Sequence, residues 1–110
     1  MLSGSWLKEP ARQAKITQES WEGVDRDLFN TLRKLRASLA GQRRVPAYVV
    51  FSDATLRDMA KQRPSTVEQF LDIKGVGQKK CKQYGAAMLS TISDYCAAQG
   101  IGMDVEVWNE

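Results

Sequence analysis

The chain has 110 residues, of which 43% are hydrophobic and 26% charged, and its formal net charge is +3. It contains no histidine, which excludes catalysis by an imidazole base, and its two cysteines are too few for a disulfide framework or a zinc site. No apolar stretch reaches the ~18 residues of a membrane span, and the start does not resemble a signal peptide. We therefore expect one small, soluble, intracellular domain that is not an enzyme and needs no metal and no cofactor.

The basic side chains are concentrated in the middle of the chain. Residues 26–82 carry thirteen Lys or Arg against five Asp or Glu, a net charge of +8, whereas residues 96–110 hold three acids and no base. A basic middle followed by an acidic tail suits a polyanionic partner such as a nucleic acid. A merely solvated surface explains the charge equally well, so charge alone does not decide between the two.

Residues 1–20 contain Pro10 and show no sustained hydrophobic period, which indicates a linker or the end of a preceding domain. A helix follows, with Asp25 as its expected N-cap and Gly41 as its expected C-terminal stop. Its apolar residues recur at helical spacing and predict one buried stripe, made of Leu28, Phe29, Leu32, Leu35 and Leu39. The other face carries bases that continue past the helix end, namely Arg33, Lys34, Arg36, Arg43 and Arg44.

The segment that comes next, residues 45–51, reads VPAYVVF. Pro46 restricts the residue before it to an extended conformation, which predicts an extended loop. A buried strand is disfavoured because the sequence offers no second strand to pair with it. Tyr48 is either a core residue of this segment or an aromatic placed among positive charges for a ligand to stack on, and the residues alone leave both open.

Two shorter helices are predicted after this loop. Ser52 is the expected N-cap of the first, which Pro64 should end at or before Arg63. Ser65 and Glu68 have the spacing of a capping box, which predicts the start of the second. The apolar residues expected to face inward in that second helix are Val67, Phe70 and Leu71.

A glycine-flanked turn, with Gly75 and Gly77 on either side of one valine, leads into the last helical segment. Such a turn exposes backbone N–H groups at the positive end of a helix, which favours a phosphate. The bases around it include Lys74, Lys79 and Lys80. The turn is similar to the hairpin of helix-hairpin-helix modules, which hold a nucleic-acid backbone without sequence preference. Two closely crossing helices would require the same glycines, so a purely structural role stays open.

Apolar residues from Cys81 to Cys96 recur at three and four, which predicts one long helix or two short ones broken at Gly85. Both cysteines lie on this apolar stripe, which favours core packing over reactivity. No convincing strand is visible, so the predicted fold class is all-α, a compact bundle of about five short helices. Residues 98–110 contain Trp108 and predict a C-terminal tail that either packs on the bundle or stays mobile.

Several segments together resemble a known family: DLFNTLRKLRASLA, VPAYVVFSDATLRDMA, RPSTVEQFLDIKGVGQKK and YGAAML. They are similar, in order and without large gaps, to the HRDC domain (helicase and RNase D C-terminal), in particular to that of bacterial RecQ-family DNA helicases. The resemblance implies a domain over residues 21–97 that performs no catalysis and is joined by a linker to an ATP-dependent helicase core. It further implies a monomer that acts on DNA in repair and recombination, in the bacterial cytoplasm at the nucleoid.

The resemblance also implies which residues contact nucleic acid. The aromatic of the family's V-P-x-Y-V-V-F motif falls on Tyr48, the basic helix positions fall on Arg33, Lys34 and Arg36, and the glycine turn falls on residues 75–77. The full set of candidate nucleic-acid-binding residues is Arg33, Lys34, Arg36, Arg43, Arg44, Tyr48, Lys74, Gly75, Gly77, Lys79 and Lys80. Many relatives carry proline where this chain has Ala47, which predicts a less rigid segment before Tyr48.

The leading hypothesis is therefore an auxiliary domain that binds single-stranded or branched DNA, with phosphates on the bases and one base stacked on Tyr48. A second hypothesis is a protein-interaction module that docks on its own helicase core or on a partner, for which Trp6, Trp21 and Trp108 lie outside the main helical stripes. A third is an RNA-binding accessory domain of an RNase D-like exonuclease. We expect no interaction with membranes.

Overall fold

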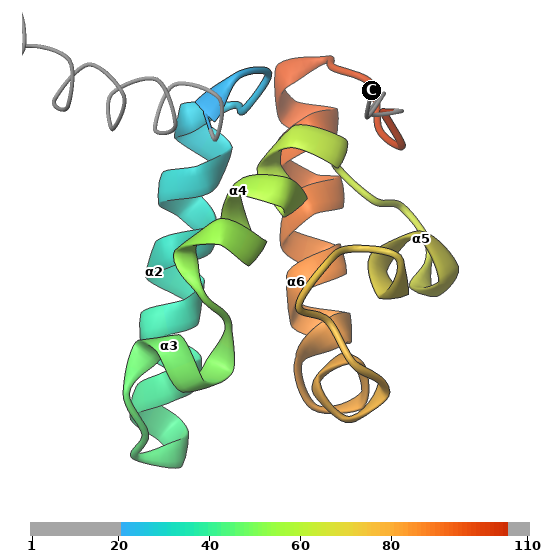
Figure 1. Cartoon of the computed structure of the whole chain (residues 1–110). Coiled ribbons are helices and arrows are strands. Elements are labelled where there is room, and N and C mark those ends of the chain that lie inside the picture. The colour runs from blue at the N-terminus through green and yellow to red at the C-terminus, as the bar shows by residue number, and fades with distance from the viewer. Residues whose placement is uncertain (1–20, 106–110) are drawn as a thin grey trace, which may run out of the picture.

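The computed structural model describes residues 21–105, and five helices lie wholly within this range (Figure 1). In chain order they are α2 (Arg26–Arg43), α3 (Ala47–Val50), α4 (Asp53–Gln62), α5 (Val67–Leu71) and α6 (Gln78–Gln99). The described part of the chain contains no strand, and none of its helices is both long and apolar enough to cross a membrane. The predicted all-α bundle of about five helices is confirmed. The expected linker 1–20, with Trp6, and also Trp108 lie outside the described residues.

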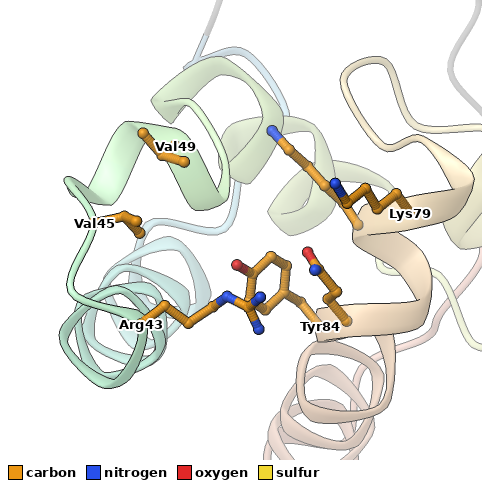
Figure 2. A pocket seen from close by; sticks show the side chains of 7 residues that line it. Arg43, Val45, Val49, Lys79 and Tyr84 are labelled. Atoms are coloured by element: carbon orange, nitrogen blue, oxygen red, sulfur yellow. The ribbon is translucent and has the colours of Figure 1, made fainter.

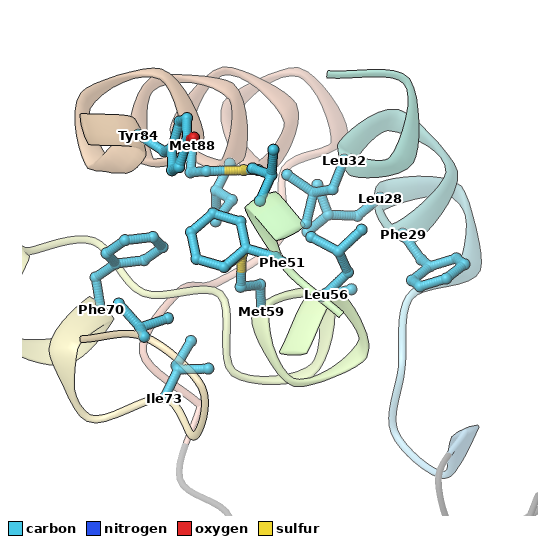
Figure 3. Packing of buried hydrophobic residues seen from close by; sticks show 14 of the residues in the cluster. Leu28, Phe29, Leu32, Phe51, Leu56, Met59, Phe70, Ile73, Tyr84 and Met88 are labelled. Carbon is cyan, nitrogen blue, oxygen red and sulfur yellow. The ribbon is translucent and has the colours of Figure 1, made fainter. Parts of the chain in front are cut away.

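The two long helices, α2 and α6, pack against each other and carry the smaller ones (Figure 1). Helices α3 and α4 pack on α2, and α5 packs on α6. Between them lies a core dominated by Phe51, whose fully buried ring meets Phe70 and Tyr84 edge to face, with ring centroids 6.2 and 5.7 Å apart (Figure 3). Fully buried aliphatic and sulfur side chains fill the rest, among them Leu28, Leu32, Leu56, Met59, Ile73, Met88 and Ile92.

Helix α2 begins as predicted but ends later. The Asp25 carboxylate accepts a hydrogen bond from the Leu28 N–H (3.1 Å), which confirms it as the N-cap. The expected stop at Gly41 is wrong, because that glycine lies inside the helix. The helix ends in a Schellman motif with Arg44 in the left-handed conformation (φ 59°), where the Val45 N–H donates to the Ala40 carbonyl (3.0 Å).

The expected extended loop over residues 45–51 is wrong as well, because α3 forms one helical turn there. Pro46 restricts only the residue before it, and its own fixed φ (−62°) suits the position directly before a helix. Side chains in a helical turn point in different directions from those in an extended segment. It buries Val50 completely and leaves Tyr48 72% exposed.

The caps of the next two helices follow the prediction only in part. Ser52 is confirmed as the N-cap of α4, since its hydroxyl accepts from the Thr55 N–H (3.2 Å), and α4 ends before Pro64 as predicted. The predicted capping box of α5 is wrong, because Thr66 is the N-cap and accepts from the Gln69 N–H (3.2 Å). The start is therefore one residue later, which leaves Val67 half exposed and not inward as predicted.

Ser65 is not the cap because it is held by the segment that follows α6. The Asp104 carboxylate accepts hydrogen bonds from both the backbone N–H (2.8 Å) and the hydroxyl of Ser65. The Asp104 N–H donates to the Arg63 carbonyl (2.7 Å), and the Arg63 Nε–H donates to the Gly102 carbonyl (2.7 Å). The described part of the predicted C-terminal tail therefore packs on the bundle.

Helix α6 is one uninterrupted helix that runs through Gly85 to Gln99 and ends at Gly100 in the left-handed conformation. Gly85 is buried, and a Cβ there would lie 3.6 Å from the Phe70 ring. The glycine therefore packs against Phe70 of α5 and does not break the helix.

The turn between α5 and α6 depends on Gly75. This residue has a φ of +95°, and a Cβ at this position would collide with the Thr55 hydroxyl. The same hydroxyl donates to the Lys74 carbonyl (3.1 Å). The Thr55 hydroxyl therefore attaches the turn to α4 and also leaves no room for a side chain at position 75.

We expect Gly75→Ala to lower the free energy of unfolding by roughly 1–3 kcal/mol, because it combines positive φ with this collision. The matched control is Gly41→Ala, where a Cβ meets nothing within 4 Å inside a helix. That control should be stabilising by about 0.5–1 kcal/mol. Urea unfolding followed by circular dichroism measures both. Equal midpoints for wild type and Gly75→Ala would contradict the structural role of the turn.

A second prediction concerns pH. Tyr95 on α6 donates its hydroxyl to the Asp25 carboxylate (2.8 Å), and burial raises the pKa of Tyr95 to about 12, to which this hydrogen bond and the charge of Asp25 contribute. Since an unfolded tyrosine titrates near pH ~10, the associated stability is complete below about pH 10 and is lost as the pH rises through about 12.

Ultraviolet absorbance titration of the phenols measures the shift directly. The wild-type chain should show one transition near pH 12 that Tyr95→Phe lacks, and the loss of stability above about pH 10 should be smaller in that variant. A Tyr95 transition near pH ~10 in the folded protein would overturn the assignment.

Candidate nucleic-acid interface

A basic groove with a volume of about 280 Å³ lies where the end of α2, helix α3 and the first turns of α6 meet (Figure 2). Its lining residues are Arg43, Val45, Val49, Lys79, Lys80, Gln83 and Tyr84. The positive charges come from both sides, with Arg43 on α2 and the two lysines on α6. Residues that are 36 positions apart in the sequence therefore form one cationic surface.

Aromatic rings of the core support the cations of the basic groove. The Arg43 guanidinium lies 5.7 Å from the centroid of the Tyr84 ring, and the Lys80 ammonium lies 5.7 Å from that of Phe51. Within residues 21–105, neither cation nor Lys79 has a carboxylate partner, since the one ion pair there joins Arg36 to Asp53. The three charges are therefore available to an external anion.

Tyr48 follows Ala47 on the short helix that borders the basic groove, next to the groove-lining Val49. With 72% of its surface exposed it is not a core residue, and its role in stacking on a ligand stays a prediction. Val49 is 42% exposed as well. The α3 edge of the groove thus presents an aromatic and an aliphatic side chain to the solvent.

Arg36 does not lie on an exposed face, and this expectation is wrong. Its side chain is buried, and its Nη1 group donates to the Phe51 carbonyl (2.9 Å) and contacts the Asp53 carboxylate (2.8 Å). A guanidinium held in this way has little freedom to reach a phosphate. The predicted basic face of α2 therefore loses one member.

The remaining bases of α2 are exposed but separate from the basic groove. Arg33 and Lys34 line another hollow, together with Asn30 and Ala37. Lys34 precedes Arg43 by nine residues, which is about 900° of rotation in an α-helix and places the two on opposite sides of α2. Arg44, at the left-handed helix end, is exposed.

The glycine turn contributes the start of α6 to the groove. Gly77 is the N-cap, without a side-chain hydrogen bond, so among the described residues no side chain caps the N–H groups of the first turn. Lys79 and Lys80 lie in that turn, whereas Lys74 and Gly75 are exposed before it. Only the two lysines of this predicted set line the groove.

Sequence reasoning missed four lining residues, Val45, Val49, Gln83 and Tyr84; Tyr84 belongs to the apolar stripe predicted for the last helix. Gln83 follows Lys79 by four residues and Tyr84 follows Lys80 by four, which places each on the same side of the helix as that lysine. Helical spacing would have found these two. Within the described range no group of His, Cys, Asp or Glu could hold a metal ion.

Comparison with known families fits this architecture. Residues 25–92 match the model of the HRDC domain, and the chain belongs to this family. HRDC is an accessory, generally non-catalytic domain of RecQ helicases.

Individual relatives agree with the family. The chain is 39% identical over 88 residues to the ATP-dependent DNA helicase RecQ of Bacillus subtilis, covering 80% of this chain and 14% of that protein. It is 41% identical over 71 residues to the RecQ of Pasteurella multocida, covering 64% of this chain and 11% of that protein. A solved structure described as D. radiodurans RecQ HRDC domain 3 matches with a TM-score of 0.61 and 35% identity, covering 63% of this chain and 91% of that one.

The start of α6 yields a testable prediction about stability. Lysines in the first turn of a helix oppose the helix dipole, whereas an acid there is favourable by about 0.3–1 kcal/mol. We therefore expect Lys79→Glu to raise the free energy of unfolding by an amount of this order, measured by urea unfolding.

The matched control is Lys82→Glu, which lies one turn further into α6, where the dipole effect has faded. Positions 79 and 82 are three apart, so either variant pairs an acid with a base, in the more favourable orientation for Lys79→Glu. Equal stabilisation by both variants would show that the helix end is not the cause.

Proposed function

We propose that this domain is an auxiliary nucleic-acid-binding module of a RecQ-type DNA helicase, and that it binds single-stranded or branched DNA in the basic groove. The observation that carries the proposal is the convergence of Arg43, Lys79 and Lys80 in one groove that is bordered by α3, the helix that carries the exposed Tyr48. The three cations bind phosphates, and Tyr48 stacks on an unpaired base.

The energetics of the groove support an anionic ligand. Arg43 and the two lysines bring like charges together without a carboxylate partner among the described residues, and the lysines also oppose the dipole of α6. Both features cost stability in the free domain. Phosphates in the groove would turn both the charge repulsion and the unfavourable dipole interaction into attraction, because they pair with the cations and lie at the positive end of the helix.

The exposed aromatic supports a single-stranded ligand over a duplex. Stacking on Tyr48 requires a base that is not paired within a helix, and one such stack contributes about 1–3 kcal/mol whatever the base. Three phosphate contacts on a single strand predict that the logarithm of the association constant falls with a slope of about −2 against the logarithm of the salt concentration. Binding should therefore be modest and should disappear in high salt.

The chain spans 14% of the Bacillus subtilis helicase and 11% of the Pasteurella multocida helicase that it matches. In the proposed role it is one monomeric unit of a longer helicase at the bacterial nucleoid, where it raises the local concentration of DNA near an ATP-dependent motor core. Docking on that core is the second candidate function. It is favoured by Val67 and Val105, which are apolar and 50% and 38% exposed.

The decisive experiment is fluorescence anisotropy of a labelled single-stranded oligonucleotide titrated with wild type and Tyr48→Ala. The variant should bind about 5- to 150-fold more weakly, the equivalent of one lost stack. Its thermal unfolding should match wild type because the side chain is exposed. Tyr48→Phe is the control, since it keeps the ring and should bind almost normally.

The competing functions give different outcomes. No binding by the wild-type chain at ~mM oligonucleotide in low salt would leave docking on the helicase core as the function. Stronger binding to an RNA than to a DNA of the same sequence would favour the accessory domain of an RNase D-like exonuclease. Unchanged binding by Tyr48→Ala would remove the stacking mechanism.

A further inference from the structure

Arg36 is the one arginine among the described residues that is buried, with 8% of its surface exposed. Its Nη1 group contacts both the Phe51 carbonyl (2.9 Å) and the Asp53 carboxylate (2.8 Å), while its Nε–H has no partner in the described part of the chain. A buried guanidinium with an unpaired N–H is costly, and an apolar side chain of similar size is often at least as stable. Fold stability alone therefore gives a weak reason for an arginine at this position.

The two contacts lie on either side of one junction. Phe51 is the residue that ends α3, and Asp53 is the first residue of α4. A single nitrogen of Arg36 therefore ties the end of one helix and the start of the next to α2. The tie matters most for α3, which has four residues and no side-chain cap of its own.

The position of α3 decides the geometry of the basic groove. The helix carries Tyr48 and Val49, and Val49 lines the groove opposite the lysines of α6. Arg36 and Arg43 are seven residues apart, about 700° of rotation in an α-helix, so they lie within about 20° of each other on one side of α2. The residue that holds α3 and the residue that supplies a groove cation thus belong to the same face of the same helix.

We propose that Arg36 is a positioning residue for nucleic-acid binding. It fixes α3 so that Tyr48 faces the ligand beside Arg43, and it does not touch the nucleic acid itself. The inference rests on the proposed function of the basic groove. It replaces the phosphate contact that the sequence pattern assigned to Arg36 with an indirect role.

The test compares binding of a labelled single-stranded oligonucleotide by the full 110-residue chain and its variants over a range of salt concentrations. Arg36→Met keeps an unbranched, flexible side chain, shorter than that of arginine, and removes both contacts. We expect it to bind about 3- to 30-fold more weakly at a temperature where circular dichroism finds it folded. Its salt slope should equal that of wild type, because no phosphate contact is lost.

Two controls define that slope. Lys79→Met removes a proposed phosphate contact and should make the slope shallower by about 0.7. Lys61→Met removes the same charge from α4, outside the groove-lining residues, and should leave the slope unchanged. A slope for Arg36→Met that changes as in Lys79→Met would show direct phosphate contact and would overturn the proposal.

A double-mutant cycle separates positioning from a general loss of structure. Because Arg36 acts through the aromatic, Arg36→Met should weaken binding in the wild-type background and add no further loss in the Tyr48→Ala background. Additive losses would overturn the inference. If the wild-type chain does not bind, the proposed function fails. If it binds but Tyr48→Ala has no effect, stacking fails. If only Arg36→Met has no effect, the positioning role fails.

Arg36→Lys keeps the test valid if Arg36→Met does not fold. It retains the charge, but its nitrogen is one bond closer to the backbone than Nη1 of arginine, so a positioning role predicts weaker binding and shifted NMR signals of residues 47–50 in the free protein. Wild-type affinity and unshifted signals in Arg36→Lys would overturn the proposal.

Discussion

The packing of Phe51 is the interaction on which the rest of the domain depends. Its ring is fully buried and meets Phe70 and Tyr84 edge to face, while its carbonyl accepts the hydrogen bond from Arg36. One residue at the junction of α3 and α4 thereby brings α2, α5 and α6 into contact (Figure 3). The basic groove forms beside this junction, since Tyr84 supports Arg43 and the Phe51 ring supports Lys80.

Around the groove the chain departs from the choices that would stabilise the free domain. Lysines occupy the first turn of α6 although the helix dipole disfavours them there, and Tyr48 exposes most of its ring to water. Departures of this kind concentrate at functional sites, because a ligand supplies the interactions that the free protein lacks.

The fold class and some of the helix ends follow from signals in the sequence. Asp25 and Ser52 cap their helices, Pro64 follows the end of α4, and Gly75 forms the turn before α6, all as expected. These features are predictable because each depends on a few adjacent residues: a side chain that accepts a nearby N–H, a proline without an N–H, or a glycine with positive φ. Local signals also pointed to the lysines beside the glycine turn, and the family resemblance pointed to Tyr48, but neither gave their relation in space.

Tertiary packing, by contrast, determines which of these residues meet. It folded residues 47–50 into a helical turn that exposes Tyr48, and it buried Arg36, which the sequence pattern placed on a basic face. It moved the cap of α5 to Thr66, because Asp104, far along the chain, holds the preceding serine. The basic groove also results from contacts between residues that are distant in the sequence. Arg43 and Lys79 are brought together by the packing of α2 against α6, and spacing within one helix carries no information about such a distant pairing.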